Sequence, residues 1–80
     1  MSHLTIIDGI RFVPVTTKMS DGSFNADVVV GECDNCGNVT RIMSAHRAGE
    51  GFETRTEAKS RAREKRDELV KRHINGDVLQ

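Results

Sequence analysis

Two cysteines separated by two residues are the feature of this sequence most able to do chemistry. Cys33 and Cys36 lie in the stretch GECDNCGNVT, residues 31–40, and the chain of 80 residues contains no other cysteine. Thiolates at this spacing can face one metal ion, or they can form a reversible disulfide. A closed zinc site needs four ligands, so the sequence raises the question of which other residues would complete it.

A redox dithiol of the thioredoxin kind is the first interpretation, and the local pattern disfavours it. Such a site places its first cysteine at a helix N-terminus, where free amides and the helix dipole stabilise a thiolate. Here Gly37 and Asn38 follow Cys36 and lead into an alternating, strand-like pattern. The helix that redox chemistry requires is therefore not predicted.

Zinc binding is the second interpretation. The arrangement of strand, Cys-x-x-Cys-Gly and strand over residues 31–40 resembles one half of a zinc ribbon. The resemblance implies a tight turn at Gly37 that directs backbone amides at the sulfurs. The second cysteine pair of that family is absent, so a zinc ion would need other ligands of this chain or the cysteines of a second copy. A third interpretation stays open beside these two: free thiols in a glycine-assisted turn, with no metal.

The elements that would position the cysteines are predicted from residue pattern. The dipeptide Asp8-Gly9 suits a two-residue hairpin turn, and the stretch SDGS at 20–23 is a second turn signal. Pro14 has no amide donor, which predicts an edge position or a bulge. Strands are predicted at about 3–7, 10–17, 24–32 and 38–46, with RAGEG at 47–51 ending the sheet. Because sequential strands usually pair, the simplest topology is a four-stranded antiparallel meander.

A long helix is predicted after the sheet. Thr54 and Glu57 have the spacing of a capping box, no Gly or Pro occurs from there to Ile74, and Gly76 follows. A narrow stripe of mostly small side chains would face the sheet: Ala58, Ala62, Leu69, Val70 and His73. The sequence thus predicts an α+β fold, a β-meander with one long C-terminal α-helix (about 54–74) packed on one face. Residues 1–76 are predicted to form a single domain, and residues 77–80 a flexible tail.

The meander selects among the possible zinc ligands. Two strand reversals place the Asp8-Gly9 turn and the cysteine loop at the same end of the sheet, and the helix runs back toward that end. His73 is therefore the best third ligand for Cys33 and Cys36, with Asp77, Asp8 or a water as a weak fourth. In contrast, His3 and His46 are predicted at the far end, and eight residues of strand put His46 roughly 26 Å from the cysteines.

The basic flank of the helix suggests a different function. The segment TRTEAKSRAREK, residues 54–65, resembles the final helix of double-stranded-RNA-binding domains, which implies phosphate contacts by Arg55, Lys59 and Arg63. Arg66 continues the same flank. The first helix of that family is absent, and Glu57 dilutes the basic cluster. The alternative is that the bases lie beside the buried stripe and pair with outer acids, as in Glu57–Arg61, Asp67–Lys71 and Glu68–Arg72.

Composition limits the function classes. The net charge is zero, but residues 1–40 carry two Lys/Arg and five Asp/Glu, and residues 41–80 carry ten and seven. No apolar run approaches the ~20 residues of a membrane span, and the start lacks a signal-peptide layout, so a cytoplasmic protein is predicted. Apolar residues are only 36% of the chain, so a metal or a dimer partner would help its small core.

No catalytic residues are predicted, because no nucleophile–base spacing and no phosphate loop is present. The predicted function is non-enzymatic binding of a protein partner by an adaptor or inhibitor-type protein, as monomer or homodimer. One zinc ion at the cysteine loop is a possible cofactor, and nucleic-acid binding through the helix is the alternative function.

Overall fold

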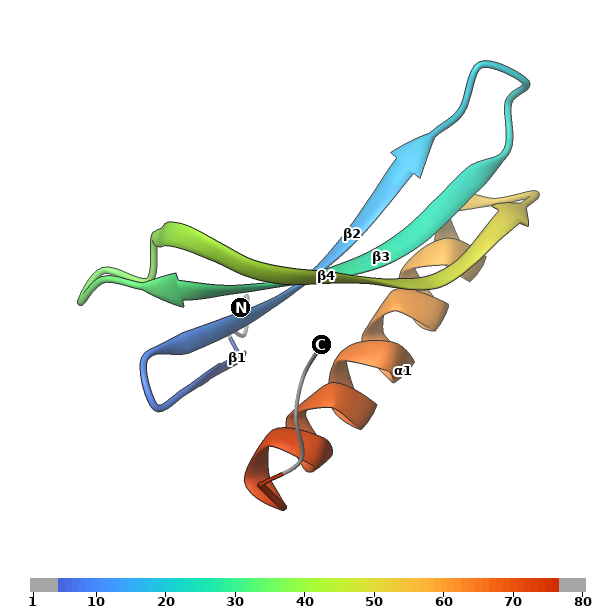
Figure 1. Ribbon diagram of the computed structural model, residues 1–80. Coiled ribbons are helices and arrows are strands. Elements are labelled where there is room, and N and C mark those ends of the chain that lie inside the picture. Colours follow the sequence, from blue (N-terminus) through green and yellow to red (C-terminus); the bar gives the residue numbers. More distant parts are fainter. Residues whose placement is uncertain (1–4, 77–80) are drawn as a thin grey trace.

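The computed structural model describes residues 5–76 and shows one open antiparallel sheet followed by a single helix (Figure 1). The elements are β1 (Thr5–Ile7), β2 (Ile10–Lys18), β3 (Phe24–Cys33), β4 (Val39–Phe52) and α1 (Arg55–Ile74). The sheet order is β1-β2-β3-β4, each strand antiparallel to the next. The predicted α+β class and the meander are therefore confirmed. The predicted tail, residues 77–80, and the predicted strand positions 3 and 4 lie outside the described residues.

The first hairpin turn forms as its sequence predicts. Asp8 and Gly9 both have positive φ angles, 54° and 75°. This conformation matches the right-handed twist of the flanking strands, and it favours Asp and Gly at the two positions. The turn fixes the register in which Ile7 lies opposite Ile10.

β4 is longer than predicted. The prediction ended this strand near His46 and assigned RAGEG to a turn, whereas the strand continues to Phe52. Gly49 lies opposite Ala26, and a Cβ atom at Gly49 would stand only 2.7 Å from the Phe52 ring. The glycine therefore makes room for an aromatic ring within the strand. Several register shifts in the β3–β4 pair accompany the extension.

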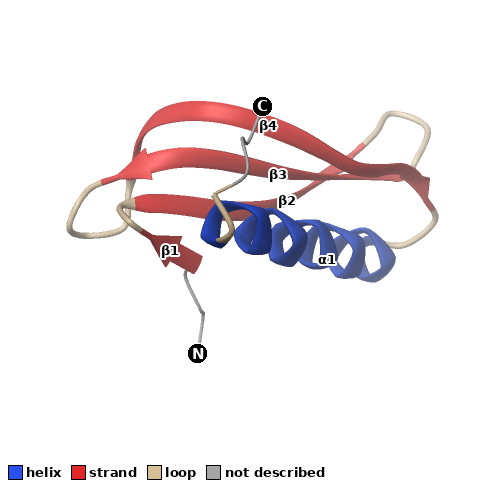
Figure 2. Cartoon of the chain, turned by 60° about the horizontal axis from the view of Figure 1, so that its bottom comes forward, coloured by secondary structure: helices blue, strands red, loops and turns tan. Residues whose placement is uncertain are grey.

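The core lies between the sheet and α1 and consists of two clusters. Phe12, Val28, Val30 and Leu69 form the larger cluster, and Ala26, Ala58 and Ala62 form the smaller one. Three methyl side chains let the N-terminal half of α1 approach β3 more closely than bulky residues would. Figure 2 shows α1 on one face of the sheet, with the other face uncovered by any described element.

The predicted helix start is confirmed. Thr54 is the N-cap, and its hydroxyl oxygen accepts a hydrogen bond of 3.2 Å from the Glu57 amide. The same hydroxyl donates to Glu57 Oε1 at 3.1 Å. At the other end Asn75 caps the helix, and Gly76 takes a φ of 82°. The caps fix both ends of the 20-residue helix over the sheet.

We predict that Ala62→Glu unfolds the protein. Ala62 is 0% exposed, and an unpaired carboxylate buried there should cost several kcal/mol, comparable with the total stability of so small a domain. Thermal melting followed by circular dichroism measures the effect. Ser60→Glu, on the exposed side of the same helix, is the matched control and should melt near the wild-type temperature. Equal melting of Ala62→Glu and wild type would contradict the described packing of α1.

Candidate functional site

The cysteine loop, the first turn and the end of α1 lie together at one end of the sheet. The Cys33 amide donates to the Gly9 carbonyl at 2.9 Å, and the Cys33 thiol lies 3.4 Å from the same oxygen. His73 Nε2 lies 3.4 Å from Asp8 Oδ2. The helix thus brings His73 back to the Asp8-Gly9 turn, as the meander argument predicts.

Asp34 organises the cysteine loop. Its Oδ1 accepts hydrogen bonds of 2.9 Å from the amides of both Cys36 and Asn38. The backbone hydrogen bond from Asn38 is the main reason that the pKa of Asp34 lies below its ordinary value. The resemblance to a zinc ribbon implied amides directed at sulfur, but here the amides of residues 36 and 38 point to a carboxylate. The turn is therefore held by an Asp side chain of the loop itself.

The predicted metal ligands are only partly assembled. Among residues 5–76, no three His, Cys, Asp or Glu side chains are grouped so that they could hold a metal ion. Both cysteines are free thiols, and His73 packs edge-on against Phe12, with ring centroids 5.8 Å apart. Asp77 and His3 lie outside the described residues. The zinc ion stays a prediction, which native mass spectrometry would test together with the number of subunits.

His46 lies in a different place from the one predicted. It is not at the far end of the sheet but in the middle of β4, opposite Val28. Its Nε2 atom is 3.0 Å from the Ser44 hydroxyl. Burial lowers the pKa of His46, and the positive charges of Lys65 and Arg72 on α1 lower it further. His46 therefore faces the helix and favours its neutral form.

The two flanks of α1 differ in how their charges are used. On the β4 side the bases pair with acids of the helix: Arg61–Glu64 at 2.9 Å, Lys65–Glu68 at 3.3 Å and Arg72–Glu68 at 3.0 Å. The predicted Glu68–Arg72 pair is thus confirmed. The predicted Glu57–Arg61 pair is wrong, because the Glu57 carboxylate accepts from Thr54 and Arg61 bonds to Glu64.

The four bases named as nucleic-acid contacts lie on the β2 side or at the helix start. Arg55 stacks over the Phe24 ring at 5.4 Å, and Arg66 pairs with Asp67 at 3.2 Å. Lys59 and Arg63 make no ion pair with any residue in the range 5–76. They line a groove of about 130 Å³ together with Pro14, Thr16 and Ala62. Two bases without an ion pair in residues 5–76 therefore lie together beside β2.

The face of the sheet opposite α1 has an apolar centre. Val13, Val29 and Ala45 lie directly opposite one another on β2, β3 and β4, and Val15 follows Val13 on the same face. We call these four residues the open face. The next row along the sheet ends in two exposed isoleucines, Ile6 at 40% and Ile42 at 66%.

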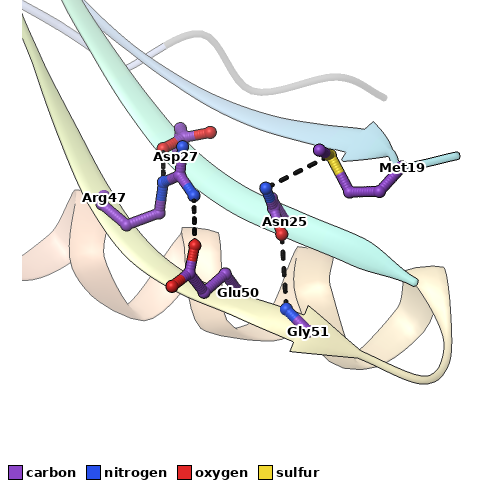
Figure 3. Close-up of polar contacts among 6 residues, drawn as sticks. All are labelled: Met19, Asn25, Asp27, Arg47, Glu50 and Gly51. Carbon is purple, nitrogen blue, oxygen red and sulfur yellow. Dashed lines mark hydrogen bonds and ion pairs between the residues drawn. The ribbon is translucent and has the colours of Figure 1, made fainter. Parts of the chain in front are cut away.

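Polar groups border the open face on its other side (Figure 3). Arg47 bridges two carboxylates, with Nε at 2.6 Å from Asp27 and a terminal nitrogen at 3.0 Å from Glu50. Asn25, only 9% exposed, accepts from the Gly51 amide at 3.3 Å, and its amide nitrogen lies 3.3 Å from the Met19 sulfur. These contacts tie β2, β3 and β4 together at the border of the apolar centre.

The sequence prediction did not include the open face. Its signal is the run Val28-Val29-Val30, in which apolar side chains point to both faces of a strand. The alternation of Phe24, Ala26, Val28 and Val30 identified the buried face alone. An unbroken valine run predicts cover on both faces, and the described chain covers one.

Comparison with known proteins gives no relative: no protein family, no curated protein and no solved structure matches the chain. Within residues 5–76, no helix is long and apolar enough to cross a membrane.

We predict that His46 makes stability depend on pH. Because folding lowers its pKa below 6.5, the unfolded chain binds more protons in the window just below pH 6.5. The His46 contribution is therefore fully present above about pH 6.5 and is lost as the pH falls toward the folded-state pKa.

The measurement is urea unfolding between pH 7.5 and 5.5 for wild type and His46→Gln, which does not titrate. The stability difference between the two proteins should shrink or reverse in favour of the variant at the acidic end. Parallel profiles across this range would contradict the described environment of His46.

Proposed function

We propose that this chain is a small non-enzymatic binding protein, of the adaptor or inhibitor type, that acts in the cytoplasm through contacts with a protein partner. The observation that carries the proposal is the open face. An apolar centre with an ionic border is the arrangement of a protein–protein interface, where the core is depleted of charge and the rim is polar.

Covering the apolar side chains of the open face would contribute favourable free energy to the binding of a partner. Val13, Val15 and Val29 are only half-buried in the described chain, and Ala45 is exposed. Removing apolar surface from water contributes about 25 cal/mol per Å², so a partner that covered this strip would gain from each valine. The ion pairs of Arg47 would then lie at the rim, where they contribute to specificity more than to affinity.

Nucleic-acid binding is the second candidate, and Lys59 and Arg63 support it. These two bases lie on one flank of α1 and have no acidic partner within residues 5–76. However, Glu64 and Asp67 line the adjoining recess with them, which reduces the local positive potential. The two candidates differ in salt response, because phosphate contacts weaken steeply as salt rises and apolar docking does not.

We predict that Ala45→Lys abolishes partner binding without unfolding the protein. Ala45 is exposed at the centre of the open face, so a charge there should leave the melting temperature nearly unchanged and should prevent apolar docking. Ser60→Lys, on the outer face of α1, adds the same charge elsewhere. The measurement is capture from nuclease-treated cytoplasmic extract by immobilised wild type and both variants, followed by titration of the purified captured protein.

Wild type and Ser60→Lys should capture and bind the same protein, and Ala45→Lys should not. Equal binding by all three proteins would contradict docking on the open face. Capture from untreated extract that is lost in the nuclease-treated extract would favour the nucleic-acid candidate instead.

A further inference from the structure

Within residues 5–76, half of β2 has no strand on its outer edge. β1 is three residues long and pairs only with Ile10, Arg11 and Phe12. Beyond that point, no strand within residues 5–76 lies beside Val13–Lys18 on the side away from β3. Figures 1 and 2 show β1 beside the first part of β2. A strand edge of this kind is a template for pairing with another chain.

The hydrogen-bonding pattern identifies the free groups on this edge. The Met19 amide donates to Ser23 and the Cys33 amide donates to Gly9, so the residue pairs at both ends of the regular β2–β3 ladder are hydrogen-bonded. Antiparallel pairs alternate between bonded and non-bonded, so the odd-numbered residues of β2 bond to β3. The backbone groups of Pro14, Thr16 and Lys18 therefore point outward. This places the missing N–H of Pro14 on the outer edge, where proline is tolerated in a sheet.

The two sides of this edge have different chemistry. On the side of α1, the side chains of Pro14 and Thr16 line the groove that contains Lys59 and Arg63. On the other side lie Val13 and Val15, which belong to the open face. An additional strand would therefore direct alternate side chains toward Lys59 and Arg63, which make no ion pair with residues 5–76, and toward an apolar strip.

We propose that an extended acidic segment of the protein partner adds to the sheet as a strand along Val13–Lys18. Its backbone pairs with the outward groups of Thr16 and Lys18, and its acidic side chains reach Lys59 and Arg63. Its apolar side chains continue the open face beside Val13 and Val15. The segment thus alternates acidic and β-branched residues, and this inference rests on the proposed function because the strand extends the same docking surface.

The small number of bases beside β2 and the outward amides of its edge both favour a peptide over a nucleic acid as the binding partner. Lys59 and Arg63 are two bases next to Glu64 and Asp67, which suits a few carboxylates better than a continuous phosphate backbone. The outward amides of Thr16 and Lys18 add main-chain hydrogen bonds that only an extended peptide can match along the strand. Self-pairing of two copies is disfavoured, because Pro14 would remove a donor from each copy.

The test uses a fluorescent peptide of about eight residues in which Glu alternates with Val, long enough to span Val13–Lys18. Fluorescence anisotropy with the full chain should show binding that weakens as salt rises, but less steeply than phosphate contacts would, because apolar side chains and backbone hydrogen bonds also contribute. A peptide in which Lys replaces Glu should bind at least about tenfold more weakly, and so should a Glu peptide whose alternate amides are N-methylated. A labelled RNA duplex is titrated in parallel.

Two protein variants locate the binding. Thr16→Pro removes an outward amide without breaking the β2–β3 ladder, and it should weaken peptide binding about five- to tenfold, while Thr16→Val should not. Lys59→Gln/Arg63→Gln should weaken binding of the Glu peptide about tenfold and reduce its salt dependence, whereas Lys71→Gln should have little effect. If Thr16→Pro melts early, the N-methylated peptide tests the backbone contacts independently.

Failure of the Glu peptide to bind, or equal binding of the Glu and N-methylated peptides, would overturn the proposal. Tighter binding of the RNA duplex, lost in the Lys59→Gln/Arg63→Gln variant, would overturn it in favour of nucleic acid. If the Glu peptide does not bind but binding of the captured protein is still lost in Ala45→Lys, the proposed function stands and strand addition alone is wrong.

Discussion

The close contact between α1 and β3 determines which surfaces of the sheet and the helix are buried and which stay exposed. Ala26, Ala58 and Ala62 are all fully buried, and they leave no space between the two backbones for a larger side chain. A single helix seated this closely covers one face of the sheet. It cannot reach the opposite face, where valines of β2 and β3 remain half-buried. The exposed apolar surface is therefore a consequence of how the core is built.

The same contact determines how the charges of α1 are used. The narrow buried stripe leaves a row of bases on each side of it. On the β4 side the acids of the helix neutralise these bases, and His46 lies beneath them with a lowered pKa. On the β2 side Lys59 and Arg63 stay without ion pairs in the described chain. An uncompensated charge beside a free strand edge is a feature that a binding partner could use, and it arises without any specialised pocket.

Local signals in the sequence predicted most of the fold. The Asp8-Gly9 turn, the cap at Thr54 and the apolar periods of strands and helix each act over a few residues, so they can be recognised without tertiary information. The extension of β4 could not be predicted in this way. It depends on the Phe52 ring filling the space above Gly49. The sequence around Gly49, RAGEG, has the composition of a turn and gives no sign of this contact.

The candidate sites were predictable to a smaller extent. Topology alone brought His73 to the cysteine end, because the direction of each element follows from the meander. The role of Asp34 could not be predicted, since a carboxylate between two cysteines can bond to the loop amides only when the loop closes around it. Pro14 indicated an outer edge on β2, but the part of this edge that residues 5–76 leave without a partner depends on where β1 pairs. The positive charge beside this edge depends on which flank of α1 has its bases paired with acids.

Amide hydrogen exchange along β2, followed by NMR, distinguishes a strand edge without a partner from a paired one. We expect an alternating pattern: the amides of Val13, Val15 and Thr17, bonded to β3, should exchange slowly, and those of Thr16 and Lys18 should exchange quickly. Protection of Thr16 and Lys18 equal to that of Val15 would mean that another strand already pairs with this edge. That result would contradict strand addition along the edge of β2 that residues 5–76 leave without a partner beside the basic flank of α1.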